Sequence, residues 1–325
     1  MNIVYASNDG YARHLAVSMY SLLEHNSEAE ELTIYLLSVL MSEEYKERLR
    51  TIAAGFGRSL AVIELGDLKE RFDYPIDTRG FDISAMSRLF SAGVLPKDVE
   101  KALYLDCDTV VLKDLRGLWN TDLGDCLVGM VMEPTVYTEI KSAIDLKQEE
   151  AYYNSGVLLM DLAGWRREGI QDKLLSYYCE KDGKLFACDQ DTLNGALHGR
   201  IKTLPPEYNF FTNYRYFKYE TLVNATSAYR EVTRQELEKA KRSPAVIHYM
   251  GDERPWIAGN RNYYRKYYEY YLERTPWKGT PKETGKELYM LLYFGMNQVT
   301  RICPPVRKWI SRRFGMKIID SRKKR

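Results

Sequence analysis

The sequence lacks a long hydrophobic run. No stretch of its 325 residues reaches the roughly 18 apolar residues that a membrane-spanning helix needs. The first residues, from Met1 to Ala6, have the pattern of a strand, without the basic region and apolar core of a secretory signal. Apolar residues make up 45% and charged residues 28% of the chain, as in ordinary globular proteins. We therefore expect a globular chain without a signal peptide or membrane span.

Cysteines in paired spacing are also absent. Five cysteines are an odd number, and no two of them are spaced as in a disulfide framework or a zinc site. This pattern predicts reduced thiols and a cytoplasmic setting. The five are Cys107, Cys126, Cys179, Cys188 and Cys303.

An excess of charge of one sign is missing from the chain as a whole, because its net charge is only +2. We therefore expect no nucleic-acid partner. The last segment differs: from Arg301 to Arg325 there are ten Lys or Arg residues and one acid, interleaved with large apolar residues such as Trp309 and Phe314. This mixture favours a helix on an anionic membrane surface. A solvated C-terminus and a basic arm for nucleic acid are the alternatives.

Strand and helix patterns alternate through the first half of the chain, which predicts an α/β fold with a mixed, mostly parallel sheet. Helical spacing indicates helices over residues 11–25, 42–54 (capped by Ser42), 84–93 (capped by Ser84), 162–181 and 190–197. Short apolar runs indicate strands over residues 2–6, 32–37, 60–65, 102–105, 127–132, 156–160 and 245–249. Residues 204–213 contain a Pro-Pro pair and are predicted to be a loop. We expect one domain over residues 1–280, followed by a basic, helical, membrane-associating tail over 281–325.

Two carboxylates, Asp106 and Asp108, directly follow the apolar run Ala102–Leu105. In open α/β sheets, ligands bind at the carboxyl ends of the strands. Two hard oxygen ligands there suit a divalent cation such as Mg²⁺ or Mn²⁺. An Asp-x-Asp pair is a weak motif by itself, and the alternative is a solvated loop.

Seven segments together resemble glycosyltransferase family 8, in its bacterial lipopolysaccharide galactosyl- and glucosyltransferase branch. Any one could occur by chance, but all seven follow the family's order and approximate spacing, from residue 2 to about residue 257. The segments are Ile3–Asp9, Ser84–Leu89, Tyr104–Asp108, Leu118–Asp125, Tyr152–Leu159, Asp189–Asn194 and His248–Trp256.

The resemblance implies a Rossmann-like fold of the GT-A type and a retaining hexosyltransferase. The donor would be a UDP-sugar, with galactose or glucose as the transferred hexose. Asp106, Asp108 and His248 match the family's metal ligands, and imidazole beside carboxylates favours Mn²⁺, with Mg²⁺ as the alternative. The acceptor would be a glycan or glycolipid, and the enzyme would lie peripherally on the inner face of the cell membrane.

The resemblance also assigns residues to the nucleotide. Ala6, Ser7, Asn8 and Tyr11 match the uridine site, where Tyr11 could stack on uracil and the Asn8 carbonyl could accept the uracil N3–H. Cys107 lies between the metal ligands. Gly251 and Arg254 match a phosphate-binding turn.

The sugar pocket is assigned in the same way. Arg88 matches a residue that contacts the donor sugar and phosphate, and Asn154, Asp189 and Gln190 match the sugar-binding positions. Glu133 stands where relatives commonly have aspartate. Gln190 matches the position beneath the anomeric carbon; because an amide is a poor nucleophile, we expect attack on the same face of the sugar. Asp189 as a covalent nucleophile stays open.

Two other classes of function remain. A strand followed by Asp-x-Asp is also typical of haloacid-dehalogenase-like phosphohydrolases, but there the motif usually opens the fold. About a hundred residues precede it here. The second alternative is a non-catalytic membrane or nucleic-acid adaptor that uses the basic tail.

Overall fold

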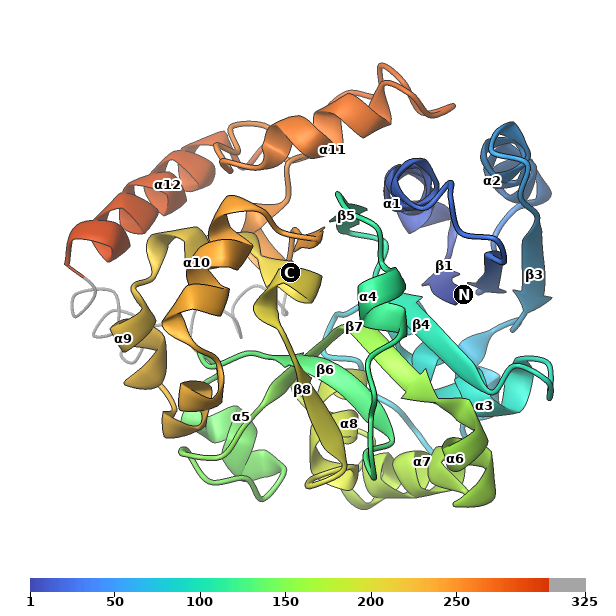
Figure 1. The fold of residues 1–325 in the computed structure, drawn as a ribbon, viewed down its shortest axis with the longest axis horizontal. Coiled ribbons are helices and arrows are strands. Elements are labelled where there is room, and N and C mark those ends of the chain that lie inside the picture. The colour runs from blue at the N-terminus through green and yellow to red at the C-terminus, as the bar shows by residue number, and fades with distance from the viewer. Residues whose placement is uncertain (304–325) are drawn as a thin grey trace.

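A seven-stranded sheet forms the centre of residues 1–303, the part of the chain that the computed structural model describes (Figure 1). Its strand order is β3-β2-β1-β4-β7-β6-β8. The first four of these are parallel neighbours, β7 is antiparallel to both β4 and β6, and β8 is parallel to β6. The strands are β1 (Asn2–Ser7), β2 (Thr33–Ser38), β3 (Leu60–Glu64), β4 (Lys101–Leu105), β6 (Val128–Met132), β7 (Tyr153–Asp161) and β8 (Ile201–Leu204).

A smaller sheet of three short strands joins segments that are far apart in the sequence. β10 (Val246–His248) is its middle strand, antiparallel to β5 (Thr109–Val111) and parallel to β9 (Phe210–Phe211). His248 at the end of β10 pairs with Thr109 on one side and with Phe211 on the other. This sheet therefore brings His248 beside the chain that leaves β4.

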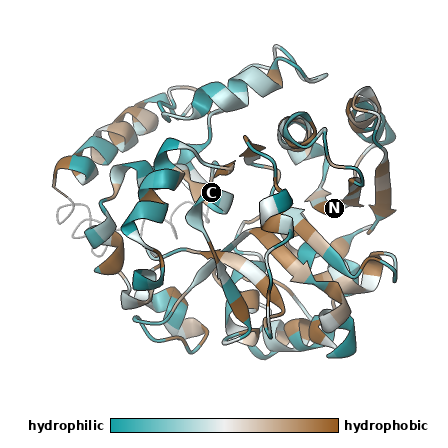
Figure 2. Cartoon of the chain, in the orientation of Figure 1, coloured by the Kyte–Doolittle hydropathy of each residue, from teal (hydrophilic) through white to brown (hydrophobic). Residues whose placement is uncertain are grey.

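Helices cover the sheets, and the strands that they cover are mostly hydrophobic (Figure 2). The first helix shows why the helices pack on the sheets. Its residues Leu15, Met19 and Leu22 fall at helical spacing, so they form one apolar face, and all three are buried. The helices are α1 (Ala12–His25), α2 (Glu43–Gly55), α3 (Ser91–Val94), α4 (Arg116–Trp119), α5 (Thr138–Ala143), α6 (Leu162–Arg167), α7 (Ile170–Glu180), α8 (Cys188–Ala196), α9 (Tyr219–Val223), α10 (Arg234–Arg242), α11 (Arg265–Leu272) and α12 (Glu287–Ile302).

The predicted α/β class with a mixed, mostly parallel sheet is confirmed, and the C-terminal region is helical over α12. The basic residues from 304 onward lie outside the described residues. Among the described helices, none is both long and apolar enough to span a bilayer.

The prediction of one helix from Ser84 was wrong. A 3-10 helix, η3 (Ile83–Phe90), comes first and is followed by α3. Asp82 is the residue that caps it, because its carboxylate accepts a hydrogen bond from the Ser84 backbone at 2.9 Å. Ser42 does precede α2, as predicted, but its side chain makes no capping hydrogen bond among the described residues.

The single helix predicted over residues 162–181 is also wrong, because it is two helices. Gly169 separates α6 from α7 and has a φ of 62°, in the left-handed region that glycine adopts without strain. The predicted loop over 204–213 contains β9, a two-residue strand whose partner is far away in the sequence. Such a short strand leaves no periodic pattern that a sequence could show.

Candidate active site

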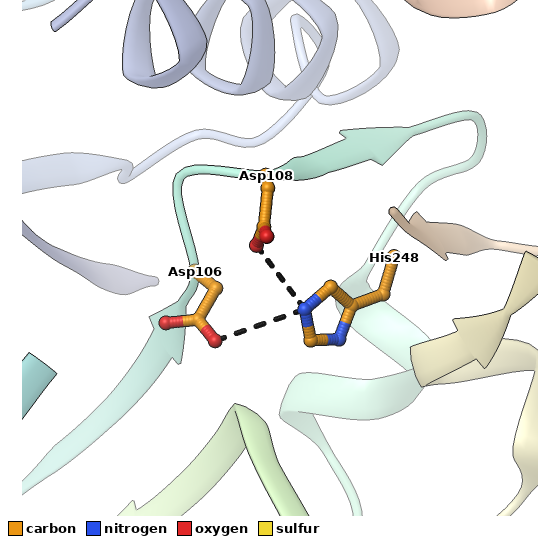
Figure 3. Close-up of side chains that lie close together, drawn as sticks. All are labelled: Asp106, Asp108 and His248. Atoms are coloured by element: carbon orange, nitrogen blue, oxygen red, sulfur yellow. Dashed lines mark ion pairs between the residues drawn. The ribbon is translucent and has the colours of Figure 1, made fainter. Parts of the chain in front are cut away.

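Three side chains that could bind a metal ion meet at the carboxyl end of β4 (Figure 3). Asp106 and Asp108 belong to the turn between β4 and β5, and His248 ends β10. The His248 Nε2 atom lies 3.1 Å from Asp108 Oδ1 and 3.8 Å from Asp106 Oδ2. One ligand atom from each of the three residues lies within 4.8 Å of the others. This donor set of two carboxylates and one imidazole fits a divalent cation.

The charges of the cluster favour a cation beside its two carboxylates. Burial alone would raise the pKa of Asp108, but His248 and Arg254 lower it to about 2. Burial alone would lower the pKa of His248, but Asp108 and Asp106 raise it above its ordinary value. Both shifts mean that the two carboxylates hold negative charge beside the imidazole and favour a positive charge there.

Asn209 orients the imidazole. Its Oδ1 atom lies 2.9 Å from His248 Nδ1, and its Nδ2 atom donates to Asn154 Oδ1 at 2.9 Å. Since the Asn209 amide donates on one side, its carbonyl oxygen accepts from the Nδ1–H of His248. The neutral ring then carries its lone pair on Nε2, the atom that faces the carboxylates.

A cavity of about 300 Å³ adjoins the cluster. Of the residues assigned from the sequence, all except Ser7 and Asn8 line it. The predicted residues in its wall are Ala6, Tyr11, Arg88, Asp106, Cys107, Asp108, Glu133, Asn154, Asp189, Gln190, His248, Gly251 and Arg254. Segments from both halves of the chain therefore meet in one site.

Ser7 and Asn8 lie beside this cavity without lining it. Ser7 is fully buried. Asn8 donates from Nδ2 to Asp82 at 2.7 Å, and its Oδ1 atom accepts from the Tyr11 backbone at 3.3 Å. In this structure the Asn8 side chain therefore fixes the start of the segment that carries Tyr11.

Arg88 is buried among carboxylates. Its side chain is 3% exposed, and it contacts Asp106 at 2.7 Å and Asp189 at 3.1 Å. Its guanidinium also stacks on the ring of Tyr104, 4.3 Å from the ring centre. Burial alone would lower the pKa of Arg88, but Asp106 and Asp189 raise it. Arg88 therefore holds Asp106 and Asp189 in place.

Arg254 has a side-chain donor that makes no hydrogen bond to the described residues. It lines the cavity 3.9 Å from Asp108, and its buried Nε atom has no hydrogen-bond partner among the described residues. A buried donor without a partner is uncommon in native proteins. An anion such as a phosphate would satisfy it.

A chain of hydrogen bonds fixes the residues that were predicted to bind the sugar. The Gln190 Nε2 atom donates to Tyr152 at 3.0 Å and to Glu133 at 3.3 Å, and Oε1 accepts from the Ser155 backbone at 3.0 Å. Glu133 also accepts from Asn154 at 3.0 Å. Burial raises the pKa of Glu133. The network extends through Asn154 and Asn209 to His248, so it connects Gln190 with the metal cluster.

Several site residues were missed from the sequence. Tyr152 and Asp191 lie within the motif segments, where the Tyr152 hydroxyl donates to Asp191 and accepts from Gln190 Nε2. The contact of Asn209 with His248 was not predicted, because Asn209 lies in the segment predicted to be a loop. Phe81 and Asp82 also line the cavity, from a stretch without a motif.

We expect Gly156→Ala to weaken binding of Mn²⁺ by at least about tenfold. This is the lower end of the loss in metal affinity when the residues that orient a metal ligand are changed. A Cβ atom at Gly156 would lie 2.4 Å from Cε1 and 2.7 Å from Nδ1 of His248. The ring would have to leave its position between Asn209 and the carboxylates. Calorimetric titration with Mn²⁺ measures the effect. Gly55→Ala is the matched control, because nothing lies within 4 Å of a Cβ there. Equal affinity in Gly156→Ala and wild type would contradict this placement of His248.

Asn209→Leu is expected to lower the affinity for Mn²⁺ by about 10- to 100-fold. Leucine cannot accept the Nδ1–H of His248, so the ring loses its orientation. Asn209→Asp keeps an acceptor oxygen and should retain most of the affinity. If both variants bound Mn²⁺ as tightly as wild type in the same titration, Asn209 would have no role in holding the ring.

Several known proteins are similar to this chain. The family model described as Glycosyl transferase family 8 matches residues 2–259. General stress protein A of Bacillus subtilis is 26% identical, over 85% of this chain and 94% of its own length. A lipopolysaccharide 1,2-glucosyltransferase of Escherichia coli K12 is 25% identical, over 89% of this chain and 82% of its own. The solved structure of the galactosyltransferase LgtC with donor and acceptor sugar analogues superposes with a TM-score of 0.71 at 26% identity, over 85% of this chain and 96% of LgtC.

Proposed function

The chain belongs to glycosyltransferase family 8, and on that premise we propose that it is a retaining, metal-dependent hexosyltransferase that uses a UDP-sugar. The observation that carries the proposal is the cavity that joins Asp106, Asp108 and His248 to Arg254 and to Gln190. Its fold is the GT-A fold of LgtC. The haloacid-dehalogenase and adaptor alternatives explain neither the family match nor this arrangement.

The donor is proposed to be UDP-galactose or UDP-glucose. The names of the relatives support this range, because one is a glucosyltransferase and another is a galactosyltransferase. Tyr11 offers an aromatic ring in the cavity wall, and Arg254 offers unsatisfied donors for phosphate oxygens. Cys107 contributes to the same wall, but its thiol donates to the Ala6 carbonyl at 3.2 Å.

Asp106, Asp108 and His248 would hold the metal, which we propose to be Mn²⁺, with Mg²⁺ as the alternative. An imidazole ligand beside two carboxylates favours Mn²⁺ over the harder Mg²⁺. When bound, the cation supplies Lewis-acid stabilisation of the charge on the departing UDP. Arg254 and the Gly251 turn would bind the diphosphate, and Arg88 would keep Asp106 in position.

Transfer with retention is proposed to proceed by attack on the same face of the sugar. The bond from the anomeric carbon to the diphosphate oxygen breaks, the acceptor oxygen bonds to that carbon from the same side, and its proton passes to the departing phosphate. Gln190 would stabilise the positive charge that develops on the sugar. Asp189 is less suited to be a covalent nucleophile here, because Arg88 and the Ser155 hydroxyl (2.8 Å) already engage its carboxylate.

The acceptor is proposed to be a glycan or glycolipid, reached from a membrane surface. Residues 1–280 would form the catalytic domain, and residues 281–325 the part that associates with an anionic membrane on its inner face. Leu288, Leu292 and Ile302 support this, because α12 exposes them to solvent ahead of the basic segment.

Calorimetric titration with nucleoside diphosphates tests the donor class. In the presence of Mn²⁺ we expect binding of UDP and much weaker binding of GDP and ADP. Equal binding of all three would contradict a uridine site. Tighter binding of GDP or ADP than of UDP would mean that the donor carries that nucleotide instead of UDP.

A further inference from the structure

The turn after β10 faces the cavity on one side and α12 on the other. The 3-10 helix η7 (Gly251–Glu253) follows His248, and Met250, Gly251 and Arg254 line the cavity. Gly251 has a φ of 63°, so the chain reverses sharply there. The two acids in between, Asp252 and Glu253, bond to α12, drawn in orange-red at the upper left of Figure 1.

Three side chains of α12 make these bonds. Tyr289 donates to Asp252 Oδ2 at 2.7 Å, while Tyr293 and Asn297 donate to Glu253 Oε1 at 2.8 and 3.0 Å. The three residues are spaced four apart, so they form one stripe along the helix. We name this stripe, with its two acidic partners, the clasp.

Glu253 needs these donors because it is a buried carboxylate. It is 2% exposed, and among the described residues no Lys or Arg pairs with it. Its third side-chain donor is the Thr212 hydroxyl at 3.3 Å. Burial raises the pKa of Glu253. A buried carboxylate that loses hydrogen-bond donors is costly, so release of α12 would force this turn to rearrange.

Rearrangement of the turn would reach Arg254, the next residue along the chain. The Glu253 backbone carbonyl accepts from Asn262 at 2.8 Å, which also ties down the start of Arg254. The Arg254 guanidinium lies 5.8 Å from the ring centre of Trp256, and the residue lines the cavity. Its Nε atom is buried and has no hydrogen-bond partner among the described residues. The direction of its guanidinium thus depends on the backbone that Glu253 fixes.

We propose that α12 positions the phosphate-binding turn, with Glu253 as the positioning residue that connects the helix to Arg254. This inference rests on the proposed function, because it assumes a nucleoside diphosphate at that turn. The proposal gives α12 a role in donor binding, although this helix contributes none of the three residues proposed to hold the metal. It also connects the segment proposed to lie on a membrane directly with the donor site.

The test compares the double variant Tyr293→Phe/Asn297→Leu of the full chain with wild type. We expect UDP with Mn²⁺ to bind about tenfold more weakly, since two hydrogen bonds to a carboxylate are removed. Binding of Mn²⁺ alone should not change, because the metal ligands are untouched. The KM for the donor should rise more than kcat falls. Leu291→Ala, at an exposed position of the same helix, is the control and should bind UDP normally.

A second experiment tests whether the double variant weakens UDP binding through Arg254. In an Arg254→Ala background, the clasp variant should weaken UDP binding by less than twofold. A variant that merely destabilises the fold would weaken Mn²⁺ binding as well, or would weaken UDP binding equally in both backgrounds; either result overturns the positioning role. UDP binding equal to wild type overturns it too. Failure of wild type itself to bind UDP with Mn²⁺ would overturn the proposed donor, and the inference with it.

Discussion

Asp108→Asn is expected to lower turnover at least about a hundredfold. Even the mutation of a residue that only hydrogen-bonds to a metal ligand typically lowers metal affinity or activity 10- to 100-fold. The substitution keeps the shape of the side chain and removes its charge. An amide is a poorer ligand than a carboxylate, and the Asp108 carboxylate lies only 3.1 Å from His248 Nε2. Asp106→Asn should have an effect of the same size, with the additional loss of a charged partner for Arg88.

The measurement is the rate of UDP release with Mn²⁺, together with the affinity for Mn²⁺ alone. Asp125→Asn is the matched control, because Asp125 is exposed and lies outside the cavity. Near-normal turnover in either Asp106→Asn or Asp108→Asn would remove the metal assignment. Loss of turnover with unchanged affinity for Mn²⁺ would contradict it as well.

Arg88→Met is expected to lower the free energy of unfolding by about 3–5 kcal/mol, the usual cost of removing one partner from a buried ion pair. The guanidinium is the shared partner of Asp106 and Asp189, and its side chain is 3% exposed. Methionine fills similar volume, so the loss comes from charge and not from a void. Chemical denaturation measures it.

Two comparisons make this result specific. Adding Asp189→Asn to Arg88→Met should recover part of the lost stability, because one unpaired buried carboxylate disappears. Arg50→Met, at a surface ion pair with a 41% exposed side chain, should leave the free energy of unfolding almost unchanged. A loss below about 1 kcal/mol in Arg88→Met would mean that water or rearrangement compensates the two carboxylates.

The strands of the main sheet were predictable because their signal is local. The apolar run before Asp106 corresponds to β4, and the early alternation of strands and helices gives the parallel half of the sheet. The boundaries between consecutive helices were harder to predict. Gly169 separates α6 from α7, although apolar residues such as Trp165 and Ile170 fall on both sides of it. Its left-handed φ, which marks the break, is visible only in the structure.

The residues of the candidate site also fall into those that the sequence predicted and those that it did not. Asp106 and Asp108 have a strand before them, and the motif order added His248, Gln190 and Arg254, all of which line one cavity. Asn209 could not be found, because its role depends on β9 pairing with a strand more than 30 residues later. The clasp is equally non-local: nothing near Glu253 in the sequence shows that α12 will cover it.

UDP release from a panel of UDP-sugars, with Mn²⁺ and with EDTA, tests whether the protein is a metal-dependent UDP-hexosyltransferase. We expect slow release from one UDP-hexose, galactose or glucose, that EDTA abolishes and added Mn²⁺ restores. Release that EDTA leaves unchanged would contradict the metal-dependent reaction. No release from any UDP-sugar, together with no binding of UDP in the presence of Mn²⁺, would contradict the proposed function as a whole.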